Sequence, residues 1–201
     1  MVRPLVLIVT SFIALVGAEA APVNYEFDTE ENACTDPQGD AGYVKEELGE
    51  CGSLRKANLP SANLNGANLR GVKMRNAELP DARMVEASLR GADLEGANLA
   101  WADLYDADLF NASLRNTRLL GADLRRSNLL GADLRHADLA GADLRGAHLQ
   151  GALLAGASLV GADLRGAHLD FTDLNGVDMR GALLDPGPIA ALYGVLGAAD
   201  E

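Results

Sequence analysis

The chain has 201 residues, enough for one or two domains, and 48% of them are hydrophobic but only 4% are aromatic. Any core must therefore be built from aliphatic side chains. The formal net charge of −12 disfavours binding to the phosphates of nucleic acid, so we expect no nucleic-acid partner.

Residues 1–20 have the pattern of a signal peptide. Arg3 precedes an apolar run over residues 5–16, and a short A-x-A stretch ends at Ala20. A membrane anchor is the rival interpretation, but the run is shorter than the roughly 20 residues that a spanning helix needs. We therefore expect cleavage between Ala20 and Ala21, a periplasmic or secreted bacterial protein, and no membrane span after cleavage.

Residues 21–51, the acidic segment, carry nine acidic residues and one lysine and show neither a helical nor a strand period. They contain both cysteines of the chain, Cys34 and Cys51. An even count in an exported chain predicts one disulfide, which would stabilise the segment by roughly 3 kcal/mol. Two free thiols are the alternative. The acidic segment is either a disulfide-closed cap or tether, or is disordered outside the disulfide.

From Leu54 to Leu184 every fifth residue is apolar: 24 of the 27 positions are Leu and three are Met. Ala lies two residues before this position in 21 cases, and the residue between is usually Asp, Asn or Ser. A step of five scatters leucines around an α-helix and sends them to alternate faces of a straight strand. Neither standard element therefore explains the spacing.

The pattern Ala-x-Leu fits a short extended piece, because positions two apart share a face. Gly, Asn and Asp after the leucine favour a turn before the next piece. Repetition builds a coil with Leu and Ala inside, and such coils must stack to bury them. Four sides of five residues are favoured, because arginines recur more often at a spacing of 20 than of 15. A column of aspartates recurs at the same spacing of 20: Asp103, Asp123, Asp143 and Asp163.

Blocks such as GADLR, GADLE, GANLR and GADLA resemble the A(D/N)LXX motif of the pentapeptide-repeat family. The resemblance covers residues 52–186 without an insertion. It implies an all-β solenoid, a right-handed quadrilateral β-helix with one pentapeptide on each of its four sides.

Residues 187–201 form the last segment, after Pro186 has ended the repeat. Four apolar residues share one face of a short predicted helix: Ile189, Leu192, Tyr193 and Leu196. Because the end of a solenoid exposes strand edges and core leucines, we expect this helix to cap the last coil. A homodimer through the same four residues is the alternative, and resembles the dimers that some family members form.

The repeats predict no catalytic, cofactor or metal site. A solenoid filled with Leu and Ala has convex sides without a cleft, and no nucleophile with its base and no phosphate loop is found. His148 and His168 are 20 residues apart and are expected to stack on adjacent coils, but no third ligand accompanies them. Residues 36–47 faintly resemble a calcium loop, but Ala41 occupies the position that requires Gly. We therefore expect a protein that is not an enzyme.

Three aromatic residues within one coil are the best candidates for a partner surface. Trp101, Tyr105 and Phe110 lie on or beside outward positions, where nothing in the repeat requires a large ring. An apolar strip follows the position after the central leucine on one side: Pro60, Pro80, Ala100, Leu120, Ala140 and Val160. Corner packing and tolerated surface variation are the alternative interpretation.

The distribution of charge decides between two functions. Residues 52–186 contain 17 acidic and 15 basic residues, a net of −2, whereas the acidic segment contributes −8. The family resemblance implies, as its best-known activity, mimicry of DNA by an acidic rod that binds a type II topoisomerase and protects it from quinolones. Such mimicry needs sustained negative potential, and three arginines beside the aspartate column are expected to neutralise it: Arg125, Arg145 and Arg165.

We therefore expect an exported, rigid scaffold that binds an unknown protein partner. The alternative function is that of a DNA mimic that binds a type II topoisomerase and protects or inhibits it.

Overall fold

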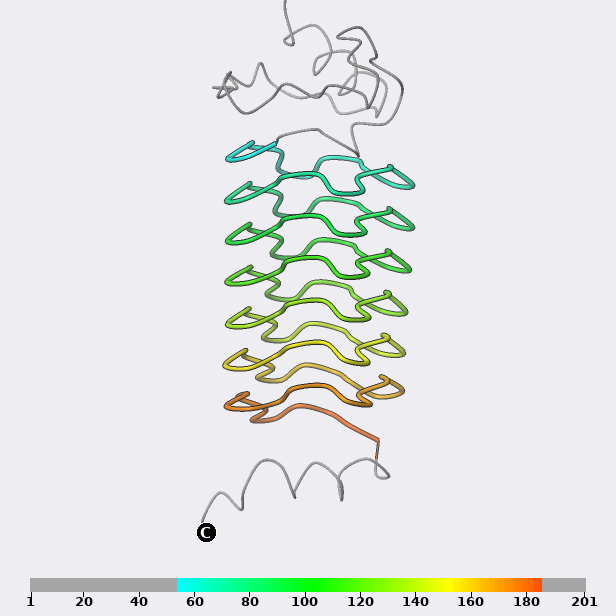
Figure 1. The fold of residues 1–201 in the computed structure, drawn as a ribbon, viewed down its shortest axis with the longest axis vertical. Coiled ribbons are helices and arrows are strands. Elements are labelled where there is room, and N and C mark those ends of the chain that lie inside the picture. Colours follow the sequence, from blue (N-terminus) through cyan, green and yellow to red (C-terminus); the bar gives the residue numbers. More distant parts are fainter. Residues whose placement is uncertain (1–53, 186–201) are drawn as a thin grey trace, which may run out of the picture.

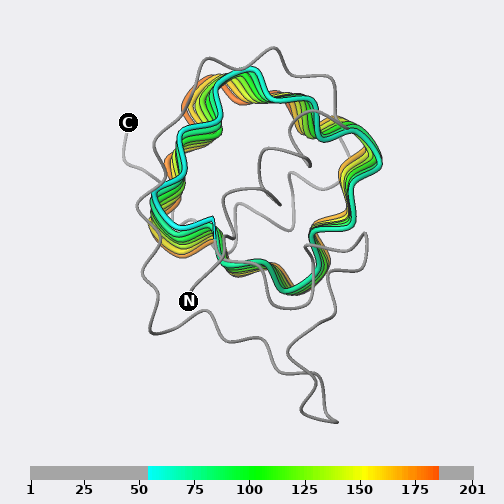
Figure 2. The ribbon, with the colours of Figure 1, turned by 90° about the horizontal axis from the view of Figure 1, so that it is seen from above.

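Between Leu54 and Asp185, which are the residues that the computed structural model describes, the chain winds into a straight stack of four-sided coils (Figures 1 and 2). Three expected features lie outside the described residues. They are the signal peptide, the acidic segment with Cys34 and Cys51, and the C-terminal helix over residues 187–201.

The register of the stack confirms the predicted number of sides. Twenty-two parallel β-bridges join the coils, and each joins residues 20 apart, beginning with Asn58 and Glu78. Four pentapeptides therefore complete one coil. Within residues 54–185 the bridges are isolated, and the chain forms neither a longer strand nor a helix, so no membrane-spanning helix occurs there. The all-β expectation is met by single-residue bridges between turns.

Each pentapeptide has five positions, named here in order: inner small, bridge, inner leucine, first turn and second turn. We number the sides by their first inner leucine, with side 1 beginning at Leu54, side 2 at Leu59, side 3 at Leu64 and side 4 at Leu69. Figure 2, which looks along the axis of the rod, shows successive coils superposed so that each side lies over the same side of the next coil.

Backbone hydrogen bonds account for four of the five N–H groups of each pentapeptide between Ala77 and Gly161. On side 1, Leu54 N–H donates to the Lys73 carbonyl at 2.7 Å, and Lys56 N–H donates to the Arg75 carbonyl at 3.0 Å. Ala57 N–H closes the turn by donating to the Leu54 carbonyl at 3.0 Å. The N–H group of each bridge residue in the later coils donates to the carbonyl of an inner small residue in the preceding coil, as Glu78 N–H does to the Ala57 carbonyl at 2.8 Å. The coils are thus bonded along their whole perimeter, which leaves little backbone unpaired.

The fifth N–H group explains why the bridge position favours Asp and Asn. It belongs to the first turn residue, and where the bridge residue two positions earlier is Asp or Asn, its side chain accepts the hydrogen bond. Tyr105 N–H, for example, donates to Asp103 Oδ1 at 3.2 Å, and Ala140 N–H donates to Asp138 Oδ1 at 3.2 Å. This contact is a local Asx-type turn bond. Many of the repeated aspartates therefore have a structural role.

The core is a column of Leu and Ala. From Leu69 to Leu164 the inner leucine positions are at most 2% exposed. Two polar residues at inner small positions, Thr117 and Ser127, are fully buried and hydrogen-bonded. The Thr117 hydroxyl donates to the Leu94 carbonyl at 2.9 Å, and the Ser127 hydroxyl donates to the Leu124 carbonyl at 2.8 Å. Their burial therefore leaves no unpaired hydroxyl.

The second turn position has a positive φ in every turn from Lys56 to Gly181, as the third residue of a type II turn requires. Glycine fills fourteen of these positions, and twelve are filled by other residues, mostly Asn, Asp or charged residues. Two large aromatic residues also stand there, Trp101 at φ 60° and Phe171 at φ 59°. Bulky residues are rare in this conformation, so both depart from the usual residues of this position.

Candidate interaction surfaces

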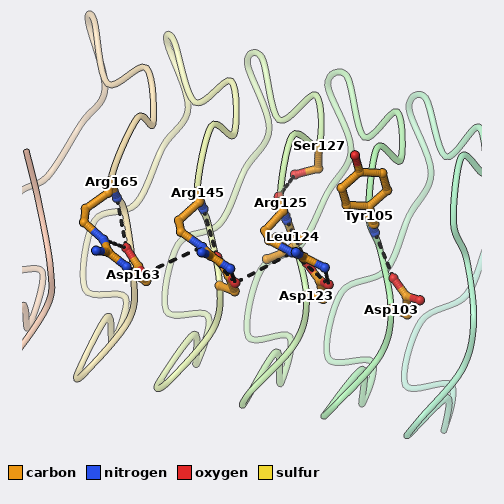
Figure 3. A network of polar contacts seen from close by, with 10 residues as sticks. Asp103, Tyr105, Asp123, Leu124, Arg125, Ser127, Arg145, Asp163 and Arg165 are labelled. Atoms are coloured by element: carbon orange, nitrogen blue, oxygen red, sulfur yellow. Dashed lines mark hydrogen bonds and ion pairs between the residues drawn. The ribbon is translucent and has the colours of Figure 1, made fainter.

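On side 3, carboxylates and guanidinium groups alternate along the rod in a ladder (Figure 3). We define the ladder by six residues: Asp123, Arg125, Asp143, Arg145, Asp163 and Arg165. Arg125 Nη2 donates to Asp123 Oδ2 at 2.6 Å, and its Nε lies 3.7 Å from Asp143 Oδ2 on the next coil. Arg145 repeats both distances with the carboxylates of residues 143 and 163.

The ladder neutralises the aspartate column, as the sequence predicts. Each of its three carboxylates is paired with the arginine two residues later, and two are also approached by an arginine of the preceding coil. Only Asp103, at the N-terminal end of the column, has an uncharged residue in place of this arginine, namely Tyr105 two positions later. Side 3 therefore presents alternating charge rather than continuous negative potential.

The same contacts hold the aspartates ionised. Hydrogen bonds from the Arg145 side chain lower the pKa of the Asp143 carboxyl, and those from Arg165 do the same for Asp163. Burial acts in the opposite direction but is the smaller effect. These carboxylates therefore remain charged through the neutral range.

Tyr105 and Phe110, two of the three aromatic candidates, are engaged by arginines of adjacent coils. The Arg125 guanidinium lies 5.3 Å from the ring centroid of Tyr105, and that of Arg126 lies 5.7 Å from it. Arg90 lies 4.4 Å from the ring centroid of Phe110. These are cation–π distances. Both rings therefore serve the packing of the surface itself.

Trp101 is placed differently, although it belongs to the same coil. It stands at the corner between sides 2 and 3, whereas Tyr105 and Phe110 stand at the next two corners. The structure thus spreads the three rings around the coil. Trp101 is 62% exposed, and its indole ring lies over Gly121 of the following coil.

The apolar strip runs along the corner that Trp101 occupies. Its side chains, one per coil, are Pro60, Pro80, Ala100, Leu120, Ala140 and Val160. Ala100 is buried in the middle of the strip, and the others are exposed or half-buried. From Leu120 to Gly161 neither turn position of this corner carries a charged residue. The apolar surface that results consists of Trp101, Leu120, Ala140 and Val160 and is here called the tryptophan corner.

Phe171 is an exposed aromatic residue that the sequence reasoning missed. It is 97% exposed and occupies the second turn position at the corner between sides 4 and 1. The signal was available, because the same position in the preceding coils holds Gly71, Gly91, Asn111, Gly131 and Gly151. A phenylalanine in that column departs from the repeat as much as Trp101 does.

The two histidines that were expected to stack do so. His148 and His168 form a β-bridge pair on side 4, with ring centroids 4.9 Å apart and an angle of 5° between the ring planes. Within residues 54–185 no group of three or more His, Cys, Asp or Glu side chains is arranged to hold a metal ion. The pair therefore continues the polar column of bridge positions.

Comparison with protein families matches the chain to pentapeptide repeats, in eight copies over residues 53–84, 81–109, 107–146 and 142–181. Comparison with curated protein sequences gives no match.

Solved structures of pentapeptide-repeat proteins are also similar. Rfr23 from the cyanobacterium Cyanothece 51142 is 40% identical over 48% of this chain and 67% of its own, with a TM-score of 0.47. HetL from the cyanobacterium Nostoc sp. strain PCC 7120 is 26% identical over 67% of this chain and 90% of its own, with a TM-score of 0.25. QnrB1, a plasmid-mediated fluoroquinolone resistance protein, is 22% identical over 79% of this chain and 94% of its own, with a TM-score of 0.38.

Proposed function

Because the chain belongs to the pentapeptide-repeat family, we propose that it acts as a rigid scaffold that binds a protein partner, without catalysing a reaction. A continuous core of Leu and Ala fills the rod, and only outward side chains remain to carry specificity. The observation that carries the proposal is the tryptophan corner. There, a large exposed ring adjoins an uncharged apolar strip, and such rings commonly anchor protein interfaces.

The second part of the proposal is that the scaffold works outside the cytoplasm. Its support is the sequence of residues 1–20 and the two cysteines of the acidic segment. Cell fractionation with thiol alkylation tests it. We expect an extracytoplasmic protein whose mass lacks residues 1–20 and whose Cys34 and Cys51 resist alkylation. A full-length, reduced and cytosolic protein would contradict export.

The alternative function is DNA mimicry towards a type II topoisomerase, and the ladder counts against it. A mimic of the DNA backbone needs negative charge that continues along the rod. Side 3, which has the longest aspartate column, instead alternates carboxylates with guanidinium groups (Figure 3). Addition of the purified protein to a topoisomerase supercoiling assay is expected to leave the rate unchanged. Inhibition that saturates with protein concentration would favour the mimic.

Substitution of Trp101 tests the proposed surface. Trp101→Ala removes the exposed ring, and Phe171→Ala is the matched control, because Phe171 is exposed and has the same turn position and φ. The wild type and both variants are used to capture partners from the extracytoplasmic fraction of the source cells. We expect a protein retained by the wild type and Phe171→Ala but lost with Trp101→Ala, and the affinity of the purified pair to fall in the same order.

The expected loss of affinity in Trp101→Ala follows from the role of the indole ring as the aromatic anchor of the interface. Truncation of a central aromatic anchor typically weakens an interface by about 2 kcal/mol or more, which is roughly a thirtyfold rise in Kd. Equal affinity of the wild type and Trp101→Ala would exclude the tryptophan corner as the binding surface.

A further inference from the structure

The first coil of the rod, residues 54–73, is the most basic part of the chain. It contains four basic residues and no acidic residue. These are Arg55, Lys56, Arg70 and Lys73, and all four are exposed. The two lysines are the only lysines in residues 52–201.

The four basic side chains gather on side 1 and its two corners. Arg55 and Lys56 form the turn that ends side 1, and Lys73 is the next bridge residue on that side. Arg70 belongs to the turn that leads into it. Lys56, Arg70 and Lys73 form no ion pair with the described residues, in contrast to the arginines of the ladder. A compact positive surface results, here called the basic coil.

The N-terminal edge of this coil also offers backbone donors. In the second coil, Glu78 N–H donates to the Ala57 carbonyl and Arg83 N–H donates to the Ala62 carbonyl, both at 2.8 Å. Asn58 and Asn63 hold the equivalent positions in the first coil, and the five-residue repeat, which begins at residue 52, supplies no earlier coil whose carbonyls could accept from them. Their N–H groups therefore add to the attraction of this end for carboxylates.

We propose that the acidic segment, residues 21–51, docks on the basic coil and covers the N-terminal end of the rod. Charge complementarity supports it, because the segment has a net charge of −8 and the coil one of +4. Continuity of the chain supports it too, since the segment ends three residues before Leu54. A link of that length gives the segment a high effective concentration at the coil.

The docked segment has a consequence for the rod as an interaction surface. It neutralises the basic coil, so the basic end does not attract other anionic molecules while the tryptophan corner stays free. This inference is independent of the proposed scaffold function, because it concerns a contact within the chain.

Carbodiimide cross-linking of the purified chain, as isolated from cells, tests the proposal. The reagent joins a carboxylate to an amine that touches it, and Lys56 and Lys73 are the only lysine amines of the rod. At low salt we expect links from these lysines to carboxylates of residues 26–50, in monomeric protein. In about 1 M salt the Debye length falls to roughly 3 Å, and the links should be lost. Lys73 and Asp93 are bridge partners on adjacent coils, and a link between them serves as the internal control.

A pair of double variants makes the test specific. Arg55→Glu with Arg70→Glu cancels the charge of the basic coil and keeps both reporter lysines. Arg83→Glu with Arg118→Glu is the control, with the same charge change at exposed positions on sides 3 and 2. The first variant should reduce the links to residues 26–50 by about tenfold, and the control should not.

Three results would overturn the proposal. They are links of Lys56 and Lys73 only to carboxylates of the rod such as Asp93, links to residues 26–50 only in dimers, and an equal reduction in both double variants.

Discussion

Replacing Gly121 by alanine tests how the rod holds its single tryptophan. A Cβ at residue 121 would overlap Cζ3 and Cε3 of the Trp101 indole ring. Gly141 is the matched control, because it has the same position at the same corner one coil later. Its φ is +64°, against +63° at Gly121, and a Cβ there would meet nothing within 4 Å.

The expected costs can be separated. Both substitutions place alanine in the left-handed region, which costs about 1 kcal/mol. Gly121→Ala must also displace an indole ring that is 62% exposed. The covered part of that ring is on the order of 80 Å², worth about 2 kcal/mol if it were all lost. We therefore expect Gly121→Ala to lower the free energy of unfolding by about 1 to 2 kcal/mol more than Gly141→Ala.

Urea unfolding measures the free energies, and fluorescence reports the ring directly, since Trp101 is the one tryptophan of the chain. Gly121→Ala should shift its emission to longer wavelength and make it easier to quench with acrylamide, whereas Gly141→Ala should leave it unchanged. In a Trp101→Ala background the two glycine variants should cost the same. Equal costs and unchanged emission in the wild-type background would refute the placement of the ring over Gly121.

Two further predictions concern the core and the ladder. Leu124→Ala, at a fully buried inner leucine, should lower the free energy of unfolding in urea by about 2 to 5 kcal/mol, whereas Leu130→Ala, at a side chain 40% exposed, should cost much less. For the ladder, the lowered pKa of Asp143 and Asp163 gives stability that is present above the ordinary carboxyl pKa of about 4 and lost as the pH falls through the lowered value. The urea concentration at the midpoint of unfolding should therefore decrease when the pH is lowered below about 4. Arg145→Gln should make this decrease smaller, and the exposed control Arg118→Gln should not.

The architecture of the rod was predictable because the repeat is strict. The 20-residue register, the buried Leu and Ala columns and the charge-neutral ladder on side 3 all follow from comparing residues 20 positions apart. The role of the bridge aspartates was predicted only in part. The sequence shows that Asp, Asn or Ser usually occupies this position, and the structure adds the hydrogen bond that Asp103 accepts from the backbone of Tyr105. That bond depends on turn geometry, which residue spacing alone does not specify.

The aromatic candidates show that the surroundings of a side chain on this rod depend on the adjacent coils as well as on its own coil. The sequence of one coil indicates only that Trp101, Tyr105 and Phe110 all lie on or beside outward positions. Their neighbours on adjacent coils differ, because Arg125 lies over Tyr105 and Arg90 lies over Phe110.

Trp101 has Gly121 at the corresponding position of the next coil, and glycine has no side chain to cover the ring. One face of the indole rests on the glycine backbone, so the ring is held in place while most of its surface stays exposed. The residue 20 positions away thus decides whether an aromatic side chain on this rod is covered or free to meet a partner. Of the three aromatic residues in this coil, Trp101 is the one that the rod leaves available on that criterion.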